Sequence, residues 1–288
     1  MKKTDSKAYI RAFYQNNTLM FAAALLLTVF SPLTNLLISW FLGEILDIIA
    51  ARDLARLQQT LYGLLALTVF FFVTELSMYR TKARFIHKAI AQYKDLAFSR
   101  LSKKSISAFS SENTSRYLSV LNNDIASIEE NYLNRSFLLI YHCVSFVGAL
   151  IMMFWCSWQL ALAALLLSVL PIAVSLSMGG ELTRREKTVS NQNESYMASL
   201  KDLLSGFAVI KSFKAERQAI DLFDKANHAV EKAKERRRWW DYLVTAVSSG
   251  CGLIFQFGIF VLGAFLAIRG NITAGTVLII VNLCNFVL

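Results

Sequence analysis

Long apolar segments alternate with charged connections along this chain, and the apolar segments have the length of membrane spans. A transmembrane helix needs roughly 20 mostly apolar residues, because the hydrocarbon core of a bilayer is about 30 Å thick. Six such segments cover residues 18–42, 57–79, 137–156, 158–178, 242–268 and 272–288. The pattern predicts an all-α, polytopic membrane protein whose transmembrane domain occupies residues 18–288.

The two long connections lack the residues that interrupt helices. No glycine or proline occurs from residue 64 to 147, and Gly206 is the only one from residue 181 to 249. We therefore predict that the membrane helices continue into a first stalk (residues 80–136) and a second stalk (residues 179–241). We expect one helix to run from residue 57 to about 104, with breaks in the serine-rich run 105–115 and at Gly206.

Basic residues are distributed asymmetrically between the two sides of the predicted membrane. Of the 30 lysines and arginines, 26 lie in residues 1–17, 80–131 or 181–238, and Arg135 lies at the mouth of the third span; only Arg52, Arg56 and Arg269 lie on the other side. The positive-inside rule predicts a cytoplasmic N-terminus and cytoplasmic stalks in the plasma (cytoplasmic) membrane. The net charge of +10 is thus explained by orientation and contact with anionic lipid, and we expect no nucleic-acid partner.

Residues 1–17 form a short unit before the first span. Tyr9, Ile10, Phe13 and Tyr14 share one helical face, and the basic residues lie around the other. This distribution favours an amphipathic elbow helix lying on the inner leaflet over a disordered basic tail.

The sequence offers no residue set for catalysis or metal binding. None of its twelve glycines precedes a lysine, so the chain contains no phosphate-binding P-loop. It has no paired catalytic carboxylates and no nucleophile–base set. The four cysteines lie in or at the end of apolar segments without metal-ligand spacing; they are Cys143, Cys156, Cys251 and Cys284. We predict no catalytic residue, cofactor or metal in this chain.

Polar residues inside spans are costly and usually face a cavity or a neighbouring helix. The deepest candidates for a substrate cavity are Asn35, Gln256, Asn282 and Asn285. An interhelical hydrogen bond is the alternative for each of them. For Glu44, Asp47 and Glu75, which lie nearer span ends, we expect pairing with another group or hydration.

Short motifs recur at the predicted turns. The first connection carries Phe109-Ser110, Leu118-Ser119 and Asn123-Asp124. The second carries the run Ser205–Phe213 followed by Glu216, and Gly270–Thr276 precedes the sixth span. In order and spacing these motifs resemble the transmembrane domain of type I ABC exporters over essentially the whole chain. Two positions depart from the family pattern: Ser115 replaces a glycine and Val120 an arginine.

The resemblance implies two partners outside this chain: a second transmembrane half and a nucleotide-binding domain. Two transmembrane halves pair, as a homodimer or a heterodimer, and each is followed by a nucleotide-binding domain that uses ATP and Mg²⁺. Because the sixth span is cut short at Leu288, we expect the chain to be truncated before that domain. The resemblance places coupling contacts near Leu121–Ile128 and Gly206–Lys214. The residues implied are Asn122, Asn123, Asp124, Gly206, Phe207, Val209 and Phe213.

These features together predict the translocation pathway of an ATP-driven exporter that works by alternating access. The resemblance implies an amphiphilic small molecule, lipid or peptide as substrate. Three alternatives remain open at this point: a secondary transporter, a membrane scaffold or sensor without an ATPase, and a half-transporter paired with a different subunit. For Phe207 and Phe213, the alternative is that they only cap the bundle of stalk helices.

Overall fold

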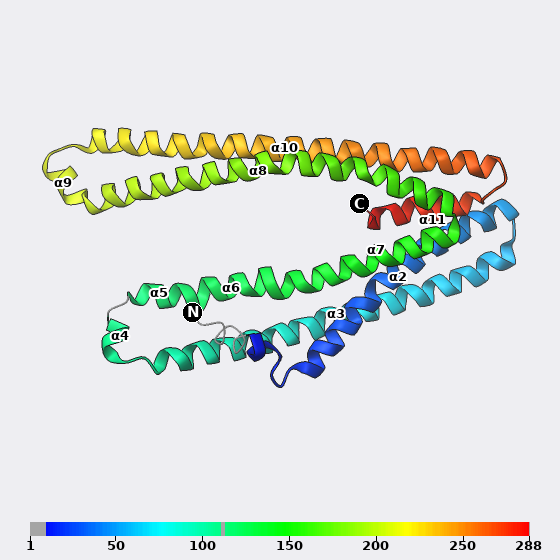
Figure 1. Ribbon diagram of the computed structural model, residues 1–288, viewed down its shortest axis with the longest axis horizontal. Coiled ribbons are helices and arrows are strands. Elements are labelled where there is room, and N and C mark those ends of the chain that lie inside the picture. The colour runs from blue at the N-terminus through cyan, green and yellow to red at the C-terminus, as the bar shows by residue number, and fades with distance from the viewer. Residues whose placement is uncertain (1–9, 111–112, 288) are drawn as a thin grey trace. The chain divides into compact units, whose positions relative to one another are not determined.

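The computed structural model describes residues 10–110 and 113–287, and the described chain is almost entirely helical (Figure 1). The elements run in the order α2 (Thr18–Ala51), α3 (Leu54–Ser102), α4 (Ile106–Ser110), α5 (Thr114–Ser119), η1 (Val120–Asp124), α6 (Ile125–Ile128), η2 (Glu129–Asn134), α7 (Arg135–Cys156), α8 (Trp158–Ser205), α9 (Phe207–Ser212), α10 (Glu216–Ile268), α11 (Ala274–Leu283) and η3 (Cys284–Phe286). The described residues contain no strand, which confirms the all-α prediction.

In the described part of the chain, five helices are long and apolar enough to cross a membrane, and a shorter apolar stretch, Ala274–Phe286, follows them. The stalk helices are continuous with the spans, as predicted. Helix α3 runs unbroken for 49 residues, whereas α8 and α10 contain 48 and 53. At 1.5 Å per residue these helices are roughly 70–80 Å long, more than twice the thickness of a bilayer core.

The chain divides into two compact units. The first comprises residues 10–161 and 262–287 of the described chain, and the second comprises residues 162–261. The second unit is a long antiparallel pair formed by α8 and α10, with α9 at its turn (Figure 1).

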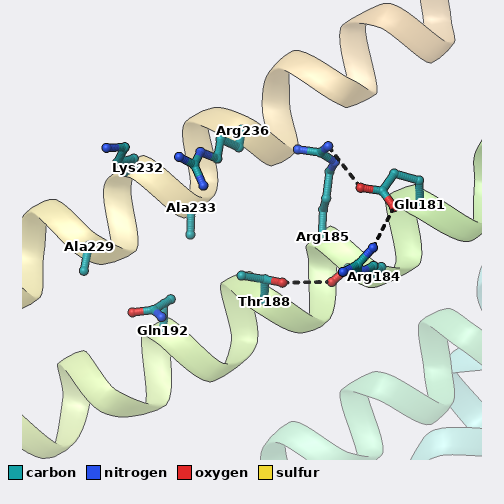
Figure 2. Close-up of a pocket in the computed structure, with 9 residues that line it drawn as sticks. All are labelled: Glu181, Arg184, Arg185, Thr188, Gln192, Ala229, Lys232, Ala233 and Arg236. Carbon is teal, nitrogen blue, oxygen red and sulfur yellow. Dashed lines mark hydrogen bonds and ion pairs between the residues drawn. The ribbon is translucent and has the colours of Figure 1, made fainter.

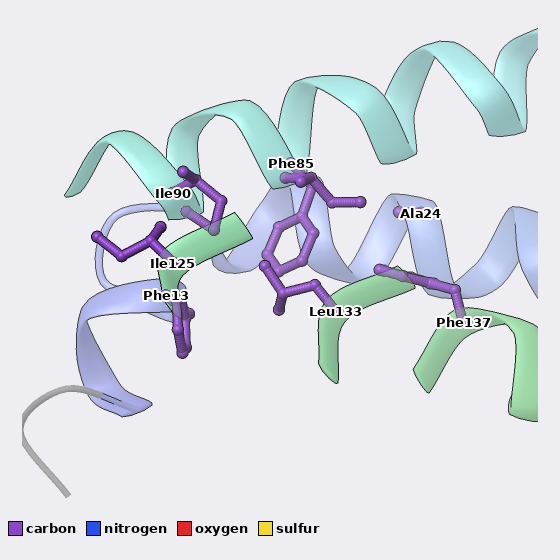
Figure 3. Close-up of a cluster of buried hydrophobic side chains, with 9 residues drawn as sticks. Phe13, Ala24, Phe85, Ile90, Ile125, Leu133 and Phe137 are labelled. Atoms are coloured by element: carbon purple, nitrogen blue, oxygen red, sulfur yellow. The ribbon is translucent and has the colours of Figure 1, made fainter. Parts of the chain in front are cut away.

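A cluster of buried apolar side chains holds the first stalk together (Figure 3). Phe85 of α3 lies at its centre with no exposed surface, and its ring packs edge-on against Phe137 of α7 at a centroid distance of 5.8 Å. Ile125 of α6 and Leu133 of η2 complete the cluster from the returning helix. The outgoing and returning helices of the first stalk are therefore joined by a continuous apolar core.

The elbow before the first span is anchored to the same cluster. Residues 10–14 are helical, and the ring of Phe13 is buried and stacks on Tyr93 of α3 at 4.9 Å. The buried Asn17 side chain donates from Nδ2 to the carbonyl of Phe85 at 3.0 Å. Ile10 is exposed, and Tyr9 lies outside the described residues. The elbow thus packs on protein through Phe13, and its contact with lipid stays a prediction.

At the far end of the first unit, α2 crosses α11 at two glycines. A Cβ atom added to Gly275 would lie 2.2 Å from the carbonyl oxygen of Gly43, so the two backbones are in direct contact. Asp47 accepts hydrogen bonds from Gly275 N at 2.8 Å and from Thr273 Oγ1 at 2.7 Å. Its carboxylate therefore satisfies the free amide at the start of α11, where the helix dipole favours negative charge.

Of the three acidic residues near span ends, Glu44 is ion-paired, whereas Glu75 and Asp47 accept hydrogen bonds from neutral groups. Glu44 forms an ion pair with Arg56 at 2.5 Å, and Glu75 accepts a hydrogen bond from Ser31 Oγ. Together with Asp47, they leave no free carboxylate among the three candidates.

Side-chain contacts fix the register of α8 against α10 along their length. Trp240 Nε1 donates to the carbonyl of Met178 at 3.5 Å, and Tyr196 packs against Phe223 at a ring distance of 5.9 Å. Between these contacts Arg237 pairs with Glu186 at 2.6 Å. The second stalk is thus a paired helical rod.

Candidate coupling turns and cavity residues

The first stalk turns through the short helix α4 (Figure 1). Phe109 of α4 stacks on Tyr117 of α5 at 5.1 Å with the rings nearly parallel, and Lys104 Nζ lies 2.9 Å from the Tyr117 hydroxyl. The Asn113 side chain caps α5 by accepting a hydrogen bond from Ser115 N at 3.0 Å. These contacts order the turn and leave Ile106 86% exposed.

The structure places the predicted first contact, residues 121–128, on the returning helix rather than at the turn. Asn122, Asn123 and Asp124 lie in the π-helical segment η1, well beyond α4, and all three are exposed. The apolar residues of this stretch face inward, because Ile125 is buried in the core cluster and Leu121 packs against it. The turn itself is at α4, inside the serine-rich run 105–115 where the sequence predicts a break. The three polar residues line the stalk behind it, and their role in coupling stays a prediction.

The second stalk turns as the sequence predicts. Helix α8 ends at Ser205, Gly206 precedes α9, and Lys214 adopts a left-handed backbone (φ 52°) before α10 begins. Phe207, Val209 and Phe213 are 58%, 60% and 80% exposed. The turn thus presents three large apolar side chains that the unit itself does not cover.

An ion pair closes the second turn. Lys211 Nζ lies 2.9 Å from Glu216 Oε1 at the start of α10, and this hydrogen bond lowers the pKa of the Glu216 carboxyl. Because the pKa is lowered in the folded state, the pair stabilises the turn above the ordinary pKa of glutamate and is lost as the pH falls through the folded value.

We expect Lys211→Ala to raise the pKa of Glu216 toward its ordinary value, because the largest cause of the shift is removed. A ¹³C-detected titration of the glutamate carboxyls would measure the change, with Lys201→Ala on α8 as the control that leaves the pKa unchanged. An unaltered Glu216 titration in Lys211→Ala would contradict the assignment of the pair.

The four candidate cavity residues are distributed over both units. Asn35 Nδ2 donates to the Tyr141 hydroxyl of α7 at 3.3 Å, which is an interhelical hydrogen bond. Asn282 Nδ2 donates to Leu278 O at 3.0 Å within its own helix, and Asn285 Nδ2 donates to Asn282 O at 3.2 Å. Gln256 is half-buried in the second unit. Only Asn282 and Asn285 are brought together directly, so a shared cavity stays a prediction.

Two features of the first stalk, the helix α4 at its turn and the π-helical segment η1 behind it, were not found from the sequence. Ile106 and Phe109 are three residues apart in a serine-rich run, and this i, i+3 spacing was the one available signal for α4. The π-helical geometry of η1 had no signal in residue type.

A family model of the ABC transporter transmembrane region matches residues 21–288. This chain belongs to the ABC transporter transmembrane family. The match includes every described helix from α3 onward and all but the first turn of α2. As a member of this family, the chain is a multi-pass membrane protein of the ABC exporter type.

Two relatives align with about two thirds of this chain. ABC transporter B family member 1 of Dictyostelium discoideum is 26% identical over 208 residues, which are 70% of this chain and 22% of that protein. A putative multidrug export ATP-binding/permease protein of Staphylococcus aureus (strain NCTC 8325 / PS 47) is 26% identical over 193 residues, which are 66% of this chain and 33% of that protein. The aligned part is thus a third or less of each relative's length.

Proposed function

We propose that this chain forms the translocation pathway of an ATP-driven exporter and is moved by an ABC ATPase domain that contacts α4 and α9. The observation that carries the proposal is the exposure of apolar side chains at the ends of two long helical stalks. Ile106 of the first turn and Phe207 and Phe213 of the second are largely exposed within their own units. Large exposed apolar groups at such sites are typical of a docking surface.

The proposed coupling uses the stalks as levers. A short helix such as α9 fits the helix-in-groove mode of recognition, in which spaced apolar anchors enter a groove of the partner. Because α8 and α10 are continuous from the turn into the spans, a displacement of α9 is transmitted along the helix axes. The core cluster around Phe85 gives the first stalk the same stiffness.

The orientation and partners follow from this mechanism. ATP and Mg²⁺ bind the ATPase domain, which places the N-terminus and both stalks in the cytoplasm and the spans in the plasma membrane. A second transmembrane half, identical or different, completes the pathway. The Staphylococcus aureus relative is named for multidrug export, and this supports export of an amphiphilic compound by the present chain. Asn35, Gln256, Asn282 and Asn285 are the candidate substrate contacts.

The test is substrate-stimulated ATP hydrolysis and transport by the full-length protein in proteoliposomes. We expect the double variant Phe207→Ala/Phe213→Ala to keep its fold and to lose transport by about tenfold or more, because central apolar anchors contribute about 2 kcal/mol or more to an interface. The matched control is Phe98→Ala/Leu222→Ala, which removes two exposed apolar side chains from the stalk helices away from the turns.

Two results would contradict the proposal. Wild-type protein without ATPase activity across a panel of amphiphiles would favour a scaffold or sensor. Equal transport by the turn variant and the control would show that α9 does not transmit the motion.

A further inference from the structure

A basic pocket lies between α8 and α10 on the stalk side of the second unit (Figure 2). Its volume is about 530 Å³, within the range of small-ligand sites. Four basic side chains line it and one carboxylate accompanies them; the charged residues are Glu181, Arg184, Arg185, Lys232 and Arg236. This excess of positive charge needs a counterion.

The single carboxylate is already engaged. Glu181 pairs with Arg185 at 3.0 Å and with Arg184 at 3.7 Å. Within the described ranges of the chain, neither Lys232 nor Arg236 has a carboxylate within 4.0 Å. Two neighbouring acids pair with other residues: Glu186 with Arg237, and Glu231 with Lys234 and Arg238.

The pocket is held open by small side chains and by a fixed arginine. Ala229 and Ala233, one turn apart on α10, line the wall opposite Thr188 and Gln192 of α8 (Figure 2). The guanidinium of Arg185 lies over the ring of Trp240 at 4.9 Å, and its buried Nε has no hydrogen-bond partner in the described part of the chain. The lining thus offers oriented donors to an anion with several acceptor oxygens.

The aromatic residues beside the pocket place it at the membrane surface. Trp239, Trp240 and Tyr242 follow the basic residues on α10, and Trp and Tyr concentrate at the level of lipid headgroups. Arg236 precedes Trp240 by four residues, or about 6 Å along the helix. The headgroup layer extends about 5–8 Å beyond the hydrocarbon on each side. The long side chains of Arg236 and Lys232 therefore reach that layer.

We propose that this pocket binds the phosphate group of an anionic phospholipid from the leaflet on the stalk side. The lipid phosphate supplies the missing negative charge to Lys232 and Arg236, and its acyl chains lie along the apolar surface of α8 and α10. A free phosphate would satisfy the same charges, but it would gain nothing from the adjacent apolar surface. The inference rests on the second unit alone and is independent of the coupling proposed at α9.

The test measures lipid retention by the intact protein. The protein is reconstituted in nanodiscs that contain phosphatidylglycerol in phosphatidylcholine, and native mass spectrometry counts the lipid that it retains. We expect Lys232→Gln/Arg236→Gln to weaken phosphatidylglycerol binding by about tenfold or more, because two charge-assisted hydrogen bonds are lost together. Phosphatidylcholine retention should be unchanged.

A control variant distinguishes binding at the pocket from general attraction of anionic lipid to the positively charged surface. Lys187→Gln/Lys234→Gln removes the same amount of charge, one residue from α8 and one from α10, at a similar depth but outside the pocket lining. We expect less than about a threefold loss there. Equal losses in both variants would show diffuse attraction and overturn the proposal, as would a failure of wild-type protein to retain phosphatidylglycerol.

A competition arm distinguishes the source of the phosphate. Inorganic phosphate at millimolar concentration should not displace phosphatidylglycerol. If it does so with comparable affinity, the pocket is a site for a soluble anion and the lipid assignment is wrong. Equal helicity of both variants by circular dichroism confirms that the loss reflects binding.

Discussion

Replacing Phe85 with alanine should destabilise the first stalk by about 3–5 kcal/mol, the usual cost of deleting a fully buried aromatic side chain. Phe85 has no exposed surface, and its ring meets Tyr14, Phe21 and Phe137. The elbow, α2 and α7 therefore all lose their common packing partner on α3.

The matched control for this prediction is Phe98→Ala on the same helix. Phe98 is 62% exposed, so its removal should change the free energy of unfolding by less than about 1 kcal/mol. Denaturant unfolding of both variants in the same lipid–detergent mixture, followed by circular dichroism, would measure the difference. Similar midpoints for the two variants would show that the cluster does not hold the stalk together.

The long helices could be predicted because their determinants are local. The absence of glycine and proline between residues 64 and 147 leaves nothing to interrupt α3 within the stalk, and the helix runs to Ser102, within two residues of the expected end. Gly206 likewise marks the end of α8. Backbone conformational preference acts within a few residues, so it can be read directly from the chain.

The first turn lies in the serine-rich run where the sequence predicts a break, but the place of residues 121–128 on the stalk could not be predicted, because it depends on tertiary packing. The apolar residues 118–128 have helical spacing, which is equally consistent with a short docking helix and with a stalk helix. What decides between them is the partner of Ile125, which is buried against α3 in the structure. Phe109 instead finds its partner in Tyr117, a contact that orders α4 at the turn.

The elbow is a second case in which the sequence pattern does not reveal the tertiary contact. The amphipathic pattern of residues 9–14 predicts an apolar face but not what covers it. Phe13 is buried against Tyr93 rather than left for lipid, and the Asn17 side chain adds a hydrogen bond to α3. The arrangement of apolar residues around a helix is a property of that helix alone, whereas the covering surface belongs to a segment some 70 residues away.

Introducing a methyl group at Gly275 should separate α2 from α11 and cost about 3 kcal/mol, at the upper end for overpacking. The new Cβ would lie 2.2 Å from the carbonyl oxygen of Gly43 and 2.5 Å from the carboxylate of Asp47. The first of these atoms is backbone and has no rotamer through which to withdraw. The variant should therefore lower the thermal midpoint of the lipid-embedded protein and weaken cross-linking between cysteines placed on α2 and α11.

For comparison, we expect Gly252→Ala to change the stability in the opposite direction. Gly252 lies within α10, and a Cβ there meets nothing within 4 Å, so alanine should stabilise by about 1 kcal/mol through helix propensity. Combining Gly275→Ala with Asp47→Ala identifies the cause of the loss. Removing the carboxylate relieves only one of the two contacts, and the penalty at Gly275 should persist because the Gly43 oxygen remains. Full rescue by Asp47→Ala would instead show that the new methyl group is opposed by the carboxylate and not by the backbone of Gly43.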